Sequence, residues 1–260
     1  MILATSHNNI NFVKKLIHDG EDVNEKDIER NTALALASNK GYEKIVEMLL
    51  KAGANLDTQN ISGITAIMRA SYNGHRKIVE MLIKAGANLN LQDKNGNTAL
   101  ILAFDNENVA EMLIKAGANL NLQDKNGNTA LILAFDNENV AEMLIKAGAN
   151  LNLQDKNGNT ALILAFDNEN VAEMLIKAGA DLNLQDKYGN TILILASDIG
   201  NAKIVEMLLK NITKIDLQNN DGDTALIRAS YNGHRKIVEM LIKAGANLNL
   251  QDKNGNTALI

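Results

Sequence analysis

The sequence predicts an all-α solenoid of stacked helix–turn–helix units joined by short hairpin-like loops. Residues 88–118, 119–149 and 150–180 are the same thirty-one letters, NLNLQDKNGNTALILAFDNENVAEMLIKAGA, written three times. A threonine also recurs at steps of 31 or 33 residues, at Thr32, Thr65, Thr98, Thr129, Thr160, Thr191, Thr224 and Thr257. A period of 20–50 residues is typical of arrays in which each unit packs only on its neighbours.

This register divides the chain into one array. We expect a degenerate first unit at 1–24, 33-residue units over 25–87, three identical 31-residue units over 88–180, further units over 181–249 and a truncated last unit at 250–260. Since about three units suffice for stability, the array is long enough to fold as a single domain.

Each unit carries the signals of two short helices and a turn. Thr98 is placed to cap a first helix over residues 99–104, and apolar residues at helical spacing predict a second helix over 109–116. Gly117 follows as a C-cap, and the Asn-Gly step at 95–96 indicates a tight turn. Neither helix reaches the ~12–15 residues that an isolated helix needs, so stacking must stabilise both.

The repeated unit D-x-x-G-x-T-A-L-x-x-A…G-H-x-x-I-V-E-M-L-I-K-A-G-A-N-L-N resembles an ankyrin repeat. The match is clearest at Gly63–Asn90 and Gly222–Asn249, where the Gly-His step of the family is present. Two features depart from the family pattern. The Thr-Pro-Leu-His motif reads Thr-Ala-Leu-Ile, as at Thr98–Ile101, and the identical units lack two residues where Gly-His should stand.

The shortened turn comes with an added aromatic ring. Where the longer units have Ser71 or Ser230, the identical units have Phe104, Phe135 and Phe166. Because a large apolar residue at helical spacing is usually buried, we expect the three rings to be buried core residues aligned along the stack. An aromatic binding platform is the alternative.

Composition excludes several classes of function. The net charge is −5 without a basic stripe, which disfavours nucleic acid, and no apolar run approaches the ~18 residues of a membrane span. There is no cysteine for a disulfide, and the first residues lack the charged and apolar regions of a secretory signal. We expect no membrane association and a cytoplasmic, intracellular location, with a host cytoplasm as the alternative.

No catalytic or metal-binding pattern stands out. The chain lacks G-x-S-x-G and Gly-rich phosphate loops, and the loop at Asp93 has neither the glycine spacing nor the glutamate of a calcium loop. His75 and His234 occupy the structural Gly-His step, where the resemblance implies that the ring bonds loop backbone. We therefore expect a protein without catalytic residues, cofactor or metal.

The resemblance implies that partners bind at the hairpin tips and the exposed face of the first helix. In the first identical unit this names Lys94, Asn95, Asn97, Asp105, Asn106 and Gln123. Tyrosine and arginine are better sources of binding energy than such polar residues. The stronger candidates are two matched sets, Arg69, Tyr72 and Asn73, and Arg228, Tyr231 and Asn232, with the apolar departures Ile61, Ile64, Tyr188 and Ile199.

These observations predict a non-catalytic scaffold that binds other proteins. A spacer array without a specific partner and a targeting module of a larger effector or enzyme are the alternatives. We expect a monomer, with weak head-to-tail association or simple fraying at the truncated unit that ends at Ile260. The resemblance also implies asparaginyl hydroxylation at Asn24, Asn90, Asn121, Asn152, Asn183 and Asn249; a role in satisfying loop backbone is the alternative.

Overall fold

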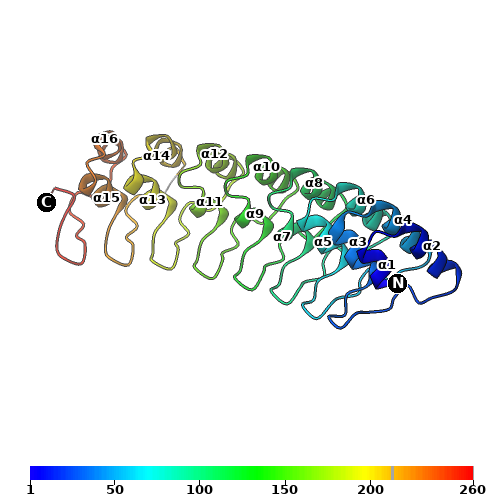
Figure 1. Cartoon of the computed structure of the whole chain (residues 1–260). Coiled ribbons are helices and arrows are strands. Elements are labelled where there is room, and N and C mark those ends of the chain that lie inside the picture. Colours follow the sequence, from blue (N-terminus) through cyan, green and yellow to red (C-terminus); the bar gives the residue numbers. More distant parts are fainter. Residues whose placement is uncertain (212–213, 260) are drawn as a thin grey trace. The chain divides into compact units, whose positions relative to one another are not determined.

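The computed structural model describes residues 1–211 and 214–259. Within these ranges the chain forms sixteen helices, arranged as eight successive pairs, and no regular strand (Figure 1). One isolated antiparallel bridge joins Lys26 to Thr32. The predicted all-α array of about eight helix pairs with little sheet is confirmed.

The array divides into two compact units, Met1–Lys125 and Asn126–Ile260. The first contains α1 (Ile2–Ser6), α2 (Ile10–His18), α3 (Ala33–Lys40), α4 (Glu43–Lys51), α5 (Ala66–Tyr72), α6 (Arg76–Lys84), α7 (Ala99–Leu102) and α8 (Glu107–Lys115). The second contains α9 (Ala130–Leu133), α10 (Glu138–Lys146), α11 (Ala161–Leu164), α12 (Glu169–Lys177), α13 (Ile192–Ile199), α14 (Ala202–Leu209), α15 (Ala225–Tyr231) and α16 (Arg235–Lys243). Within each unit the first helices of the pairs form one row, the second helices form another, and the hairpin loops project from one edge (Figure 1).

The recurring threonine begins each first helix from α3 onward, as the sequence predicted. In α9 the amide of Ile132 donates to Thr129 Oγ1 at 3.1 Å, and in α7 the amide of Ile101 donates to Thr98 Oγ1 at 3.2 Å. The threonine itself is extended and buried, for example at Thr98. The hydroxyl thus satisfies one amide that the helix start would leave unpaired.

The predicted burial of the phenylalanine rings is wrong. The first helix of an identical unit has only four residues, Ala99–Leu102 in α7, against seven in α5. Phe104 therefore lies in the turn and is 39% exposed, whereas Ser71, its counterpart in the longer unit, is fully buried on α5. Phe135 and Phe166 are half-buried in the same turn. Because the identical units lack two residues between their helices, the first helix ends before the phenylalanine, and the ring lies in the turn instead of the core.

The core is built from the inner faces of both rows. In one identical unit Leu100 from the first helix and Val109 and Leu113 from the second are almost completely buried. Alanines such as Ala99 and Ala110 fill the places between them. Because each buried leucine or valine contributes about 1.5–3 kcal/mol, stacking stabilises helices too short to persist alone.

The hairpin loop of an identical unit is closed by an aspartate and a glycine. Asp93 Oδ1 accepts the amides of Asn95 and Asn97 at 2.8 Å each, and its Oδ2 accepts the side chain of Asn97 at 3.0 Å. Gly96 has φ +82°, and a Cβ there would lie 2.8 Å from the backbone nitrogen of Lys125. Glycine is therefore required both by the left-handed turn and by the next loop.

Successive loops are also joined by side chains. Asn90 Oδ1 accepts the amide of Asn119 at 2.8 Å, and Gln92 Nε2 donates to the carbonyl of Gln123 at 2.9 Å. In the second unit Gln154 bonds the carbonyl of Gln185 in the same way, at 2.9 Å. The bond of Asn90 is a hydrogen bond to loop backbone, which the sequence analysis gave as the alternative to hydroxylation at this asparagine. Hydroxylation itself stays a prediction.

Two further observations bear on the sequence expectations. In the ranges that the structure describes, no helix has the length and apolar character needed to cross a membrane. Ile260, on which the expected association or fraying depends, lies outside the described residues.

Candidate functional site

The candidate residues gather on the row of first helices and at the hairpin tips of each unit. The sequence 69–101 is repeated letter for letter at 228–260, so α5 and α15 present the same Arg, Tyr and Asn. Their polar surroundings nevertheless differ. We call Asn31, Asn39, Asn60 and Arg69 the Arg69 centre, and Asn190, Asp198, Asn219, Asp223 and Arg228 the Arg228 centre.

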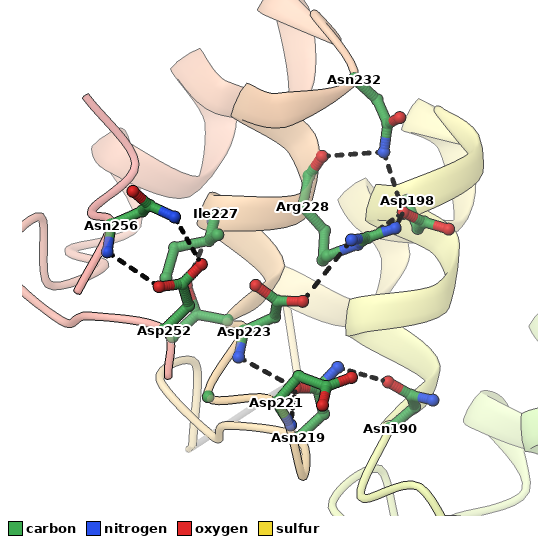
Figure 2. Close-up of polar contacts among 12 residues, drawn as sticks. Asn190, Asp198, Asn219, Asp221, Asp223, Ile227, Arg228, Asn232, Asp252 and Asn256 are labelled. Atoms are coloured by element: carbon green, nitrogen blue, oxygen red, sulfur yellow. Dashed lines mark hydrogen bonds and ion pairs between the residues drawn. The ribbon is translucent and has the colours of Figure 1, made fainter. Parts of the chain in front are cut away.

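In the Arg228 centre the guanidinium lies between two carboxylates (Figure 2). Arg228 Nε and Nη2 both contact Asp198 Oδ1, at 2.7 and 2.6 Å, and Nη1 lies 3.5 Å from Asp223 Oδ2. Asn232 adds a bond from its Nδ2 to Asp198 Oδ1 at 2.8 Å. The arginine charge is thus compensated within the chain.

Asp223 has an unusual environment for a carboxylate. Burial raises its pKa above the usual value, the Arg228 charge lowers it, and the nearby charges of Asp252 and Asp221 raise it again, so the net pKa is raised. Asn219 Oδ1 accepts the amides of Asp221 and Asp223, the role that Asp93 has in its own loop. The neutral Asn219 therefore avoids one more negative charge beside Asp223.

In the Arg69 centre the guanidinium meets only neutral amides. Nη2 donates to Asn31 Oδ1 at 3.0 Å and Nη1 to Asn39 Oδ1 at 3.4 Å, while the buried Nε has no partner. Asn60 Nδ2 donates to the same Asn31 oxygen at 3.0 Å. Among the described residues Arg69 forms no ion pair, in contrast to Arg228.

The difference comes from two substitutions outside the identical segments. Asn39 on α3 stands where Asp198 stands on α13, and Ile64, which is half-buried, stands where Asp223 stands. The partners of each arginine lie outside its identical segment, so the same sequence gives an arginine without an ion pair in one place and an ion-paired arginine in the other.

The aromatic and aliphatic candidates are exposed. Tyr72 is 70% exposed on α5, and Tyr231 is 81% exposed on α15 with the Arg228 guanidinium 5.6 Å from its ring centre. Tyr188 is exposed at a hairpin tip, with Lys187 Nζ 4.9 Å from the ring centre. Ile61 and Ile199 are exposed as expected. Side chains that combine aromatic area with a cation are suited to protein contacts.

The polar candidates of the identical unit have mixed positions. Lys94, Asn95 and Asp105 are exposed at the tip and in the helix–helix turn. Asn97 and Asn106 are partly buried: Asn97 bonds Asp93, and Asn106 caps α8 by accepting the amide of Val109 at 3.2 Å. Gln123 is half-buried in the row of loop glutamines. Asn73 is exposed and bonds Asn39 Oδ1 at 3.3 Å.

Two further residues belong to this face and were not among the sequence candidates. Ile28 is 98% exposed at the tip of the first hairpin, and Arg30 follows it with φ +63°. Arg30 lines a hollow of about 500 Å³ with Ile61 and Lys94. The threonine register could have found Arg30, because every later loop has glycine at its position.

The histidines have the structural role that the resemblance implied. His75 Nε2 lies 3.1 Å from the carbonyl oxygen of Asn39, and His234 Nε2 lies 2.9 Å from that of Asp198. The rings pack against Gly41 and Gly200, where a Cβ would collide with them. Within the described part of the chain, no group of three or more His, Cys, Asp or Glu is placed to hold a metal ion.

Comparisons with known proteins agree with this architecture. The family model of ankyrin repeats in three copies matches residues 1–93, 53–124, 82–155, 103–186, 136–219 and 193–260. The crystal structure of the ankyrin repeat domain of Bcl-3, a member of the IkappaB protein family, is similar with a TM-score of 0.68 and 25% identity, over 79% of this chain and 96% of that one. No curated protein matches the sequence. Taken with the capped helix pairs and closed hairpin loops, the family match over the whole length shows that the chain belongs to the ankyrin repeat family.

Proposed function

We propose that the chain is a non-catalytic scaffold that binds other proteins through its hairpin tips and first helices. Ankyrin repeats are in general protein–protein interaction modules. The observation that carries the proposal is the exposure of Ile28, Ile61 and Tyr72 in the first unit, and of Tyr188 and Tyr231 in the second, each at a hairpin tip or on a first helix of its own unit. Large side chains left in water on a folded surface are typical of binding sites.

Site-specific photo-crosslinking tests the proposal in cells that produce the protein. A photoreactive phenylalanine analogue replaces Tyr72, Tyr188 or Tyr231 in turn, and Lys115 at the end of α8 serves as the matched exposed control. We expect discrete crosslinked proteins from the tyrosine positions and none from position 115. Equal labelling from all four positions would contradict a specific binding face.

A spacer is the second candidate for residues 88–180, because there the corresponding tip positions are lysine and asparagine in all three copies. Lysine is depleted at interface cores, so this stretch is a poor binding surface. We propose that it sets the chain distance between the flanking repeats. A cytoplasmic location accompanies this proposal, since a cysteine-free chain is compatible with a reducing compartment.

A further inference from the structure

We infer that the first three hairpins and α5 form a docking surface for an acidic segment of a partner protein, a segment that carries carboxylates beside large apolar side chains. The inference rests on the proposed binding function and adds the chemistry of one partner. The surface consists of Ile28, Arg30, Ile61, Arg69, Tyr72 and Lys94, and we call it the basic-apolar face.

Three cations of this face lack a carboxylate partner. Among the described residues Arg30, Arg69 and Lys94 form no ion pair, whereas lysines on the second helices, such as Lys84 and Lys115, pair with a glutamate one turn earlier. Arg69 has only the two amide contacts described above, and its Nε has no hydrogen-bond partner. Because Nη1 and Nη2 contact only neutral amides, a carboxylate from outside would meet a guanidinium charge without an ion-pair partner, and Arg–carboxylate pairs are strong when bidentate.

The carboxylates close to these cations are already engaged within their own loops. Asp27 Oδ1 accepts the amides of Glu29 and Asn31 at 2.9 and 2.7 Å, and Oδ2 accepts the Asn31 side chain at 3.0 Å. Glu29 Oε2 also accepts the Asn31 side chain, at 3.3 Å. Asp93 has the same loop bonds as Asp27. These acids hold the loops in shape and leave the outward side of the guanidinium groups free for a partner.

Arg30 occupies a position where arginine is unfavourable for the backbone. Its φ of +63° is in the left-handed region, and the seven later loops have glycine there, from Gly63 to Gly255. A side chain at such a position strains the turn, and strained residues concentrate at functional sites. Its side chain borders the hollow of about 500 Å³ that Ile61 and Lys94 also line.

The apolar part of the face also departs from the later repeats. Ile28 and Ile61 are exposed at the tips of the first two loops, where Lys94 and Lys125 stand in the next two. Tyr72 extends the apolar surface along α5. The two isoleucines and the tyrosine can receive apolar side chains while the cations receive carboxylates.

The mixture of charges favours a peptide over a uniformly anionic surface. Asp27 and Glu29 share a loop with Arg30, and Asp93 is next to Lys94, so a phosphate backbone or a lipid headgroup layer would meet like charges beside these cations. A protein segment can place its carboxylates only where the cations are. The Arg228 centre lacks this capacity, because Asp198 and Asp223 already occupy its guanidinium.

Fluorescence anisotropy of the full chain tests the inference with a defined probe. The probe is a short fluorescein-labelled peptide of alternating Glu and Leu, compared with Gln–Leu and Lys–Leu peptides of the same length. We expect saturable binding of the Glu–Leu peptide alone, weakened by added salt. Arg30→Gly, which restores the residue of the other loops, should weaken it about fivefold, and Lys125→Gln on the tip of an identical unit is the matched control.

A second variant copies the Arg228 centre into the first unit. Asn39→Asp with Ile64→Asp gives Arg69 the two carboxylates that Arg228 has, and should abolish the preference for the Glu–Leu peptide. Unchanged peptide binding in Arg30→Gly, or equal losses in Lys125→Gln, would overturn the inference, as would stronger binding to phosphatidylserine vesicles or to single-stranded DNA than to the peptide. If the peptide experiments gave any of these results but photo-crosslinking still captured proteins at Tyr188 and Tyr231, the inference about the first unit would be wrong and the proposed protein-binding function would still hold.

Discussion

Arginine side chains on the first helices find partners in the preceding repeat and, for Arg228, also in the loop that leads into their own helix. Arg69 and Arg228 lie in identical thirty-three-residue segments, yet one contacts two asparagines and the other two aspartates. The sequence identified both arginines as candidates but treated them as equivalent. Their difference depends on which residue of the neighbouring repeat and of the preceding loop faces each guanidinium, and that requires the folded geometry.

Arg30→Gly is expected to raise the free energy of unfolding by about 1 kcal/mol, because a left-handed residue other than glycine costs roughly 1–2 kcal/mol, and glycine recovers less than all of it. Urea denaturation followed by circular dichroism measures the change. Arg30→Lys, which keeps the Cβ, should leave stability unaltered. Destabilisation by glycine would mean that the arginine side chain contributes more to the fold than its strained backbone costs.

The carboxyl groups of Asp27 and Asp223 should titrate on opposite sides of the usual aspartate value of 3.8. Burial acts to raise the pKa of Asp27, but the Asn31 and Glu29 hydrogen bonds and the Arg69 charge bring it below that value. Burial raises the pKa of Asp223 despite the Arg228 charge. Carbon-13 NMR of the carboxyl groups measures both titrations.

The two shifts have opposite signs for stability. Asp27 stabilises the fold above the unfolded-state pKa, and this contribution is lost as the pH falls through its lowered folded-state pKa. Ionisation of Asp223 destabilises the fold as the pH rises through its raised pKa. Accordingly, Asp27→Asn should reduce the loss of stability in acid, and a parallel titration of both groups would contradict the assignment.

Helix length distinguishes the two kinds of repeat. The threonine caps, the glycine turns and the second helices were predicted from the sequence because they depend on local chemistry. The end of the first helix was not, since similar apolar residues after the threonine begin helices that end at Tyr72 or Ile199 in longer units and at Leu102 in a short one. The position of the phenylalanine depended on that end, and so its burial was predicted wrongly.

Phe135→Ala should therefore cost less than about 2 kcal/mol, because the ring is half-exposed in a turn, whereas removal of a fully buried aromatic ring costs about 3–5 kcal/mol. Leu131→Ala, in the same repeat but buried, is the matched comparison and should cost about 2–5 kcal/mol. Chemical denaturation gives both values. A larger loss of unfolding free energy for Phe135→Ala than for Leu131→Ala would mean that the phenylalanine ring is part of the core.

Amide hydrogen exchange should separate α11 from α13 within the second unit. The four residues of α11 close a single helical turn, whereas the eight residues of α13 end at a left-handed Gly200 cap. Fewer intrahelical bonds give a lower local opening free energy. We expect Leu164 and Ala165 to exchange before Leu195 and Ala196 in peptide-resolved measurements, and similar protection would show that stacking alone sets the local stability.

The repeats of the array differ in the residues at their hairpin tips and first helices. The identical repeats have lysine and asparagine tips, and the repeats on either side have isoleucine or tyrosine on the same face. Family, helix pairing and most of the exposed face could be predicted from the repeat alone. The basic-apolar face was not predicted: the threonine register marks Arg30 as the one departure from glycine, but the exposure of Ile28 and the positive φ of Arg30 come from the structure.

Deletion of residues 119–149 tests the separate roles of these repeats. The new junction joins Ala118 to Asn150, the same letters as the native step from Ala118 to Asn119, so every remaining repeat keeps its sequence neighbours. We expect cooperative unfolding, helix content per residue close to that of the parent, and unchanged binding of the Glu–Leu peptide. An unfolded product would mean that the central repeats are not interchangeable, and lost peptide binding would assign them a part in recognition.

The letter-for-letter identity of α9 with α11, and of α10 with α12, also affects how the chain reaches its native state. A repeat that docks correctly and one that docks a full period out of place bury the same side chains, so contact energy alone does not correct the error during folding. One copy can loop out, or two chains can exchange a copy, and such misassembly is characteristic of repeat proteins. The repeats on either side differ in sequence, for example in the loop pairs Asn60–Ile64 and Asn219–Asp223. A repeat docked out of place against them would lose its native contacts, and this makes such misassembled states less stable than the native one.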